Sequence, residues 1–129
     1  MVAVDTNIIV RLLTGDDLSQ MEQAREIFTA VKIFVPDTVI LETEWVLRYA
    51  YDLSPAAIHD GLLRLLGLPN VVLRDARAMA QAFEGYHSGM DFADALHLAT
   101  CDHCSELVTF DKKFVRSAAG SFQCKVRHP

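Results

Sequence analysis

The sequence predicts an α/β fold, a sandwich in which helices cover a central, mainly parallel β-sheet. Short β-branched runs alternate with longer segments of helical periodicity, and capping residues or glycines mark the limits of those segments. The chain has 129 residues, of which 51% are hydrophobic, and it contains no linker-like stretch and no repeat. We therefore expect one compact domain over residues 1–129.

Five short apolar runs are the predicted strands: Val2–Val4, Ile33–Val35, Val71–Leu73, Leu107–Phe110 and Phe122–Val126. The first of these is expected to be buried, because it is continuously apolar. Asp5 and Asp111 each directly follow a predicted strand. Ligands bind parallel sheets outside the carboxyl ends of the strands, so both carboxylates are expected at that edge if their strands are neighbours.

Helices are predicted at residues 8–13, 17–30, 38–51, 55–67, 75–87 and 91–103. Their starts are marked by capping types, namely Thr6 or Asn7, Asp17 in a capping box with Gln20, Asp37 or Thr38, Ser54 followed by Pro55, and Asp91. Gly15 is expected to end the first helix, and Gly89 separates the last two.

Four acids in four separate segments stand out. Asp5 follows three apolar residues, a poor place for a charge without a role, although it could also cap the next helix. Asp91 and Asp94 lie at a helix start, where the dipole favours anions and where Asp91 serves equally well as a cap. Asp94 lies deeper, beside small residues. Asp111 could be a turn or cap aspartate after its strand.

Glu42 and Glu44 compete for one role on a single predicted helix, on which they point about 200° apart. Glu44 has Arg48 four residues on, the favourable order for a surface ion pair, so we expect it on a solvated face. Glu42 has apolar neighbours at i−3, i+3 and i+4 and no local cation. We assign Glu42 to the site, the alternative being an exposed residue at its rim.

Carboxylates suit hard cations such as Mg²⁺ and Mn²⁺, and a pocket of like charges repels itself unless a cation is bound. The net charge of −5 argues weakly against a nucleic-acid partner, because two bound divalent ions would bring it to about −1. The start Met-Val-Ala-Val-Asp lacks the features of a signal peptide, no apolar segment is long enough for a membrane span, and the three cysteines suit a reducing compartment. We expect a cytoplasmic protein.

Four segments resemble, in order and spacing, the acidic motifs of PIN-domain ribonucleases: Val4–Asn7, Glu42–Leu47, Asp91–Ala99 and Thr109–Phe114. The resemblance covers nearly the whole chain, and the short length is similar to the VapC-type toxins of toxin–antitoxin pairs. It implies a three-layer α/β/α sandwich, Mg²⁺- or Mn²⁺-dependent cleavage of single-stranded or structured RNA, a homodimer, and a cognate antitoxin that blocks the site.

By motif position, the resemblance assigns metal binding and catalysis to Asp5, Glu42, Asp94 and Asp111. It adds Asp91 as a further metal ligand, and Thr6 or Asn7 as residues that orient the site through hydrogen bonds. One departure is that the fourth position, Asp111, is often Asn in these toxins.

Two further groups of residues have candidate binding roles. Phosphate contact by Arg11, Lys112, Lys113 and Arg116 is expected from their positions near the acids, with a solvated charged face as the alternative. Leu41, Trp45 and Tyr49 form a second apolar stripe on the helix of Glu42. We interpret this stripe as a surface for the antitoxin or the second subunit, with burial inside the monomer as the alternative.

Rival functions are less well supported. A haloacid-dehalogenase-type phosphatase needs a second Asp two residues after the first, where this chain has Asn7, and a receiver-like domain needs an acidic pair after strand one. A PIN fold without catalysis would not require the intact acids. Cys101 and Cys104, with His97 and His103 nearby, lack a second ligand pair at zinc spacing and are expected to be neighbours on one side of a helix.

Overall fold

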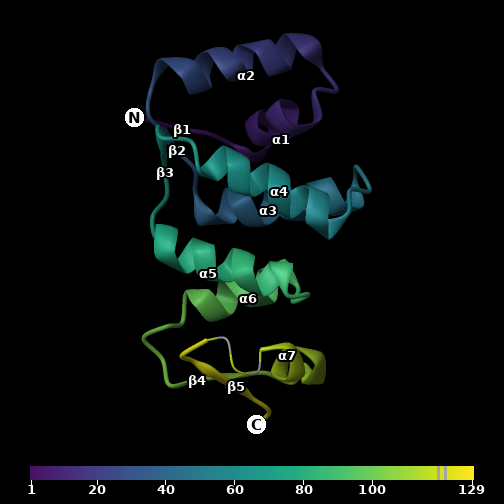
Figure 1. Cartoon of the computed structure of the whole chain (residues 1–129), viewed down its shortest axis with the longest axis vertical. Coiled ribbons are helices and arrows are strands. Elements are labelled where there is room, and N and C mark those ends of the chain that lie inside the picture. The colour runs from purple at the N-terminus through teal and green to yellow at the C-terminus, as the bar shows by residue number, and fades with distance from the viewer. Residues whose placement is uncertain (119, 121) are drawn as a thin grey trace. The chain divides into compact units, whose positions relative to one another are not determined.

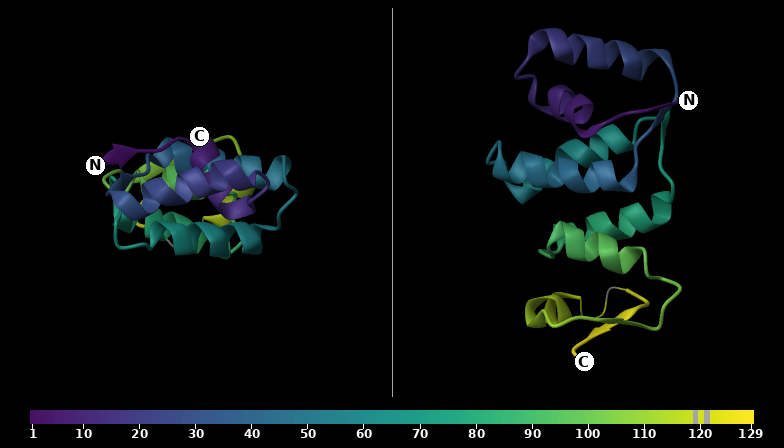
Figure 2. Two further views of the ribbon diagram at one scale, coloured as in Figure 1. Left: turned by 90° about the horizontal axis from the view of Figure 1, so that it is seen from above. Right: turned by 180° about the vertical axis from the view of Figure 1, so that it is seen from behind.

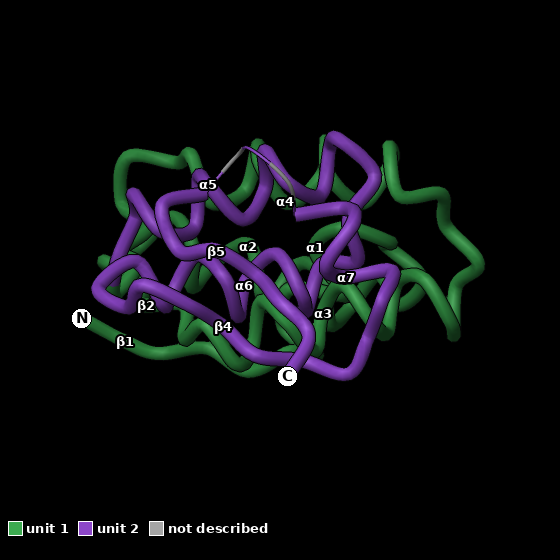
Figure 3. Tube along the Cα trace, turned by 90° about the horizontal axis from the view of Figure 1, so that it is seen from below, with its two compact units in different colours: residues 1–74 green, residues 75–129 purple. Residues whose placement is uncertain are grey.

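The computed structural model describes residues 1–118, 120 and 122–129. It contains two compact units, residues 1–74 and 75–129, coloured separately in Figure 3. The prediction of a single domain over residues 1–129 stays a prediction. Within the described residues, no helix has the length and apolar character needed to cross a membrane.

The first unit contains a three-stranded parallel sheet (Figure 1). Its strands are β1 (Val2–Ala3), β2 (Ile33–Phe34) and β3 (Val71–Val72), in the order β1-β2-β3. Ile33 lies opposite Val2 on one side and Val71 on the other. The expectation of a fully buried first strand is wrong: Val2 is 45% exposed, because β1 is an outer strand of this sheet, and only Val4 beyond it is buried.

Four helices accompany this sheet: α1 (Thr6–Thr14), α2 (Leu18–Ala30), α3 (Asp37–Tyr49) and α4 (Pro55–Leu66). Helix α1 packs on α2 and on α3, α3 packs on α4, and α4 contacts β3. The centre of the unit is filled by fully buried aliphatic side chains, among them Ile9, Ile33, Ile40, Leu47 and Leu62. Burial of this kind stabilises each element by roughly 1.5–3 kcal/mol per side chain.

Local signals set most helix limits in this unit. Gly15 ends α1 at φ 63°, a left-handed conformation that glycine adopts without strain. Asp17 caps α2 by accepting from the Gln20 amide at 2.9 Å, but the reciprocal half of the predicted capping box is absent, because the Gln20 side chain accepts from Arg11 Nε instead. Ser54 caps α4 with Pro55 at its first turn, as predicted.

Helix α3 differs from the prediction at its start. Pro36 is its N-cap residue and provides no side-chain hydrogen bond, whereas Asp37 or Thr38 was expected to cap. Asp37 instead lies in the first turn, and its Oδ2 accepts from Arg74 Nη2 at 2.9 Å. Proline suits this position because its φ is already close to the helical value and it has no amide hydrogen to satisfy.

The described residues of the second unit, 75–118, 120 and 122–129, form three helices and a two-stranded parallel sheet. They are α5 (Ala76–His87), α6 (Phe92–Ala99), β4 (Glu106–Val108), α7 (Lys112–Ser117) and β5 (Lys125–Arg127). Figure 2 shows α5 and α6 side by side. They pack through aromatic rings, and the centroid of the Phe92 ring lies 5.2 Å from the centroids of both the Phe83 and the Tyr86 ring. Gly85 permits this approach, because an added Cβ would lie 3.2 Å from the Ala95 Cβ on α6 and 3.0 Å from Met90 Sδ.

The predicted limits of three elements in the second unit are wrong. The strand predicted at Leu107–Phe110 is β4, which ends at Val108, so Asp111 does not directly follow it. Helix α6 ends at Ala99 and not near His103, and after it the Cys101 amide donates to the Leu98 carbonyl at 3.1 Å in a tighter turn. The Thr100 hydroxyl donates to the His97 carbonyl at 2.9 Å. Cys101 and Cys104 therefore lie in a turn after the helix, where the Cys104 amide donates to the Cys101 carbonyl at 2.9 Å. The last strand begins at Lys125 and not at Phe122.

Candidate active site

Asp5 and Thr6 open the site in the first unit. Asp5 lies two residues beyond β1 and is the N-cap of α1, where its Oδ1 accepts from the Thr6 amide at 2.7 Å. Its carboxylate is exposed. Capping was the structural alternative for Asp5, and the structure shows it, but one carboxylate oxygen can cap while the other remains available to a ligand.

Thr6 connects α1 to α3. Its side chain is buried, with 7% exposed, and its hydroxyl donates a hydrogen bond to Glu42 Oε1. Glu42 is exposed and does not have the apolar surroundings inferred from its sequence neighbours. This bond therefore holds the Glu42 carboxylate next to the start of α1. The sequence separation of the two residues gave no indication that they are partners.

Glu44 is the clearest correction on α3. It was expected on a solvated face, but it is 1% exposed. Its predicted ion pair with Arg48 is confirmed, with Arg48 Nε 2.9 Å from Oε2 and Nη2 3.1 Å from Oε1. Glu44 lies on the face of α3 that also buries Ile40, Thr43 and Leu47 where the helix packs on α1 and α4. The two hydrogen bonds from the Arg48 guanidinium make burial of the carboxylate possible.

The second unit carries the other three acids at two helix starts. Asp91 caps α6 by accepting from the Asp94 amide at 3.1 Å, and Asp94 follows in the first turn. Asp111 lies three residues beyond β4 and caps α7, where its Oδ1 accepts from the amides of Lys113 at 2.9 Å and Phe114 at 3.1 Å.

Asp94 is the electrostatic centre of this group. Burial raises its pKa above the ordinary value of an aspartate, and the negative charges of Asp91 and Asp111 raise it further. His97 and Lys113 act in the opposite direction and do not cancel the rise. The three carboxylates therefore repel one another, and a bound cation would relieve this repulsion.

The donor set suits a hard divalent ion. Among the residues that the structure describes, no three His, Cys, Asp or Glu side chains form a group that could hold a metal ion. The candidate acids nevertheless supply only carboxylate oxygens, the donors that Mg²⁺ and Mn²⁺ prefer. Asp94, with its raised pKa, would gain most from such a charge. The softer donors Cys101 and Cys104 are free thiols.

The candidate phosphate-binding cations differ in their surroundings. Lys112, Lys113 and Arg116 are exposed on α7. The Arg11 guanidinium is already bound, with Nε 2.7 Å from Gln20 Oε1 and Nη1 3.1 Å from both Asp16 Oδ1 and the Tyr51 hydroxyl. A small cavity of about 270 Å³ is lined by Arg11 together with Asn7. Phosphate contact by Arg11 would require it to give up part of this network.

The apolar stripe on α3 reaches solvent. Trp45 is 56% exposed and Tyr49 is 63% exposed, while Leu41 is half-buried. The Trp45 and Tyr49 rings lie 5.1 Å apart at an angle of 47°. The alternative explanation, burial of the stripe inside the monomer, therefore does not hold for Trp45 and Tyr49.

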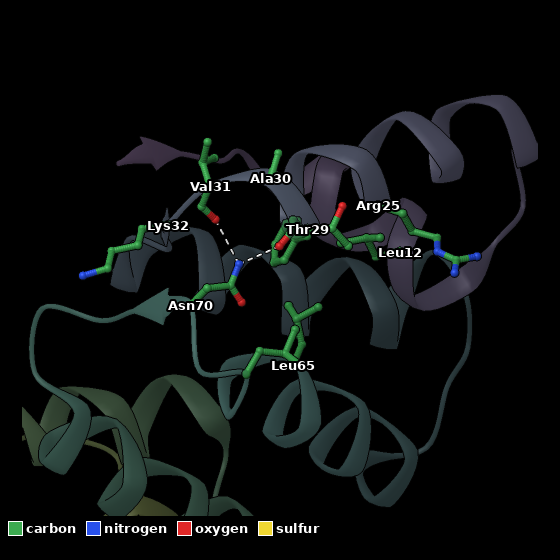
Figure 4. Close-up of a pocket in the computed structure, with 10 residues that line it drawn as sticks. Leu12, Arg25, Thr29, Ala30, Val31, Lys32, Leu65 and Asn70 are labelled. Atoms are coloured by element: carbon green, nitrogen blue, oxygen red, sulfur yellow. Dashed lines mark hydrogen bonds between the residues drawn. The ribbon is translucent and has the colours of Figure 1, made fainter.

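The first unit also contains a larger cavity, which is not lined by the candidate acids. It has a volume of about 610 Å³, and Figure 4 shows the side chains around it, including Leu12, Leu65 and Arg25. Asn70 connects segments of the cavity wall, because its Nδ2 donates to the Val31 carbonyl at 2.9 Å and to the Phe28 carbonyl. None of the candidate catalytic residues lines this cavity.

Comparison with known proteins decides the family. The family model of the PIN domain matches residues 2–120. The chain belongs to the PIN-domain family. This membership confirms the predicted fold, a PIN-type α/β/α sandwich with a mainly parallel sheet, and each strand pair described in both units is parallel. PIN domains are nucleases, so the predicted hydrolase class is confirmed at that level.

Among solved structures, the PIN-domain chain is similar to the crystal structure of VapC20 of Mycobacterium tuberculosis, a Sarcin-Ricin loop cleaving toxin. The two share 22% identity, the match covers 97% of this chain and 99% of that one, and the TM-score is 0.43. No curated protein matches the chain.

Proposed function

We propose that this PIN-domain protein is a divalent-metal-dependent endoribonuclease, the toxin of a toxin–antitoxin pair of the VapC type, acting in the cytoplasm on single-stranded or structured RNA. The observation that carries the proposal is the electrostatic interaction of Asp91 and Asp111 with Asp94, in a chain of a nuclease family. Mg²⁺ or Mn²⁺ is the proposed cofactor, because all candidate donors are carboxylates.

Each acid has a proposed role. Asp5, Glu42, Asp94 and Asp111 are the metal ligands and catalytic residues, and Asp91 is a further ligand. A divalent ion, when bound, supplies the Lewis acid that activates water and neutralises charge at the phosphate. Thr6 holds the Glu42 carboxylate by its hydrogen bond, and Asn7 is the second orienting residue. Lys112, Lys113 and Arg116 bind the RNA phosphates, with Arg11 as a secondary contact because of its existing partners.

The test is cleavage of labelled RNA by purified protein with Mg²⁺ or Mn²⁺, alongside the same reaction with EDTA. We expect cleavage that EDTA abolishes, and at least 100-fold slower cleavage by Asp94→Asn, in the range of about 10²–10⁴-fold for loss of a charge-stabilising or acid–base group. Cleavage that EDTA leaves unchanged would contradict the metal mechanism. A folded protein that binds RNA without cutting it would favour a non-catalytic PIN module instead.

The antitoxin is the proposed occupant of the surface formed by Leu41, Trp45 and Tyr49. Exposed aromatic residues are the usual anchors of protein interfaces. The exposed Glu42 carboxylate lies on the same helix, so a partner segment with an apolar anchor and a basic side chain matches this surface in polarity and charge. Binding there would place the basic group at a candidate catalytic acid and so inhibit the enzyme.

Trp45→Ala tests this surface. The partner is the product of a short adjacent reading frame, and the control is Leu63→Ala, which removes a similarly exposed apolar side chain from α4. Arg48→Ala is unsuitable as a control because Arg48 pairs with the buried Glu44. We expect loss of about 2 kcal/mol or more of binding free energy for Trp45→Ala only. Loss of self-association with intact antitoxin binding would assign the surface to the homodimer.

A further inference from the structure

The buried acid on α3 has no part in the proposed reaction. Glu44 is 1% exposed, and both of its carboxylate oxygens accept hydrogen bonds from Arg48, at 2.9 Å and 3.1 Å. Forked pairing of this kind restrains the guanidinium in position and in plane, since two parallel bonds resist rotation. Glu44 therefore immobilises an arginine that would otherwise be one of the most flexible side chains on the helix.

Arg48 transmits this restraint to Tyr49. Its guanidinium carbon lies 4.6 Å from the centroid of the Tyr49 ring, and its Nη1 donates to the Tyr49 hydroxyl at 3.3 Å. The Tyr49 ring lies in turn 5.1 Å from the Trp45 ring. A continuous series of contacts thus connects a buried carboxylate with two exposed aromatic rings.

We infer that Glu44 and Arg48 act as a clamp that fixes the rings of Tyr49 and Trp45, and that Glu44 is a positioning residue for the aromatic surface. The identity of the partner rests on the proposed function, whereas the clamp itself does not. Fixing side chains before binding reduces the conformational entropy that is lost on association. The clamp therefore keeps the surface ready for a partner in the unbound protein.

The chain contains a matched ion pair that lacks these consequences. Asp60 and Arg64 on α4 have the same i, i+4 spacing, with Arg64 Nε 3.3 Å from Asp60 Oδ1. Both side chains are largely exposed, at 63% and 81%. Water and salt screen such a pair, and it restrains its side chains little. Asp60→Asn is therefore the control for removal of a helical ion pair from the same unit.

Trp45 is the only tryptophan in the chain, so fluorescence reports on this surface directly. The experiment measures the decay of Trp45 fluorescence anisotropy in Glu44→Gln, Arg48→Lys and Asp60→Asn, without any partner. We expect the amplitude of the fast, local component to rise by half or more in the first two variants and to stay at the wild-type value in Asp60→Asn. The efficiency with which acrylamide quenches Trp45 fluorescence is expected to change in Glu44→Gln and Arg48→Lys and to stay at the wild-type value in Asp60→Asn.

A folded Glu44→Gln and a folded Arg48→Lys that both keep the wild-type decay would overturn the clamp. If Glu44→Gln does not fold, Tyr49→Phe replaces it, because this change removes only the hydroxyl that accepts from Arg48. Failure of the proposed partner surface has a different signature. In that case Trp45→Ala leaves antitoxin binding intact, while the anisotropy of the clamp variants still changes.

Discussion

Thr6 shows how much a single buried hydroxyl contributes to the candidate site. It is near the N-terminus of α1, it is almost fully buried, and it donates to Glu42 on α3. The hydrogen bond orients a carboxylate that is otherwise exposed and free to rotate. Partners of this type around metal ligands control ligand geometry and basicity.

Thr6→Val is therefore expected to slow RNA cleavage by about 10–100-fold, the usual effect of removing a hydrogen-bond partner of a metal ligand. Valine keeps the volume, so the loss of unfolding free energy should stay near 1 kcal/mol, the typical net value of one hydrogen bond. Rates at saturating Mn²⁺ and thermal melts measure both quantities. Thr29→Val, at an exposed threonine of α2, is the control, and equal slowing by both variants would count against an orienting role.

Asp94 predicts a pH dependence of stability in the metal-free protein. Its pKa is raised in the folded state, chiefly by burial and then by Asp91 and Asp111. The folded protein thus holds the proton more tightly than the unfolded chain, and stability is lost as the pH rises through the folded pKa. Below about pH 3.9, the ordinary value for Asp, the residue is protonated in both states and this loss is absent.

Asp94→Asn should therefore melt at a higher temperature than the wild type at pH 7 in EDTA, and the difference should vanish as the pH falls below the ordinary Asp value. Melts across this range measure it. A variant that is less stable than the wild type at pH 7 would show that the Asp94 carboxylate is structural. Asp102→Asn, at an exposed acid of the same unit, should show no such crossover.

Helix starts are the elements that hold the acids. Asp5, Asp91 and Asp111 each cap a helix through one carboxylate oxygen. A cap fixes the side chain against the backbone, and the positive potential of the helix N-terminus attracts the carboxylate. The same geometry thus serves stability and presents a charged oxygen, so structural and catalytic roles do not exclude each other at these positions.

Asp111 allows the two roles to be separated. Asp111→Asn retains a capping side chain and should keep the stability of α7, whereas Asp111→Ala should lose about 1 kcal/mol. Both are expected to reduce Mn²⁺-dependent cleavage, because both remove the negative charge. Denaturant unfolding and cleavage rates are the measurements, and equal stability of the two variants would contradict the importance of the cap.

Helix α7 also carries the proposed contacts to RNA. Lys112 and Arg116 are exposed one turn apart on this helix. The double variant Lys112→Ala, Arg116→Ala should reduce the slope of log K against log salt by about 1.4, since each phosphate contact on single strands contributes about 0.7. Binding of a catalytically inactive Asp94→Asn background to labelled RNA at several salt concentrations tests this. Lys125→Ala on β5 is the control, and an unchanged slope in the double variant would place the phosphate path elsewhere.

At the scale of the whole molecule, acids dominate, with a net charge of −5. A ligand that binds only the folded state stabilises it, by about 2.7 kcal/mol at a concentration 100 times its dissociation constant. Mn²⁺ or Mg²⁺ should therefore raise the melting temperature of the whole chain, and EDTA should reverse the rise. Asp94→Asn should lose most of this shift.

Asp5→Asn extends the same measurement to the acids of residues 1–74. Asparagine caps helices as well as aspartate does, so the variant should fold normally without metal. We expect it to lose a substantial part of the Mn²⁺-dependent shift. A full shift in Asp5→Asn combined with none in Asp94→Asn would restrict the metal ligands to Asp91, Asp94 and Asp111.

Much of the local structure is determined by the sequence alone. Gly15, Asp17 and Ser54 set helix limits through bonds to residues no more than a few positions away, and such signals are legible in any short window. The order of the acidic segments likewise predicts the family, which the match over residues 2–120 confirms. The roles of the individual acids remain predictions, because they depend on an ion and a substrate.

Other features depended on tertiary packing. Glu44 is buried because α3 is covered on more than one side, which the spacing of Glu44 and Arg48 does not reveal. Thr6 reaches Glu42 across 36 positions, and Arg11 reaches Tyr51 across 40. Contacts between distant segments form only when whole helices pack together, and the free energy of that packing is a property of the assembled core that no local window of sequence contains.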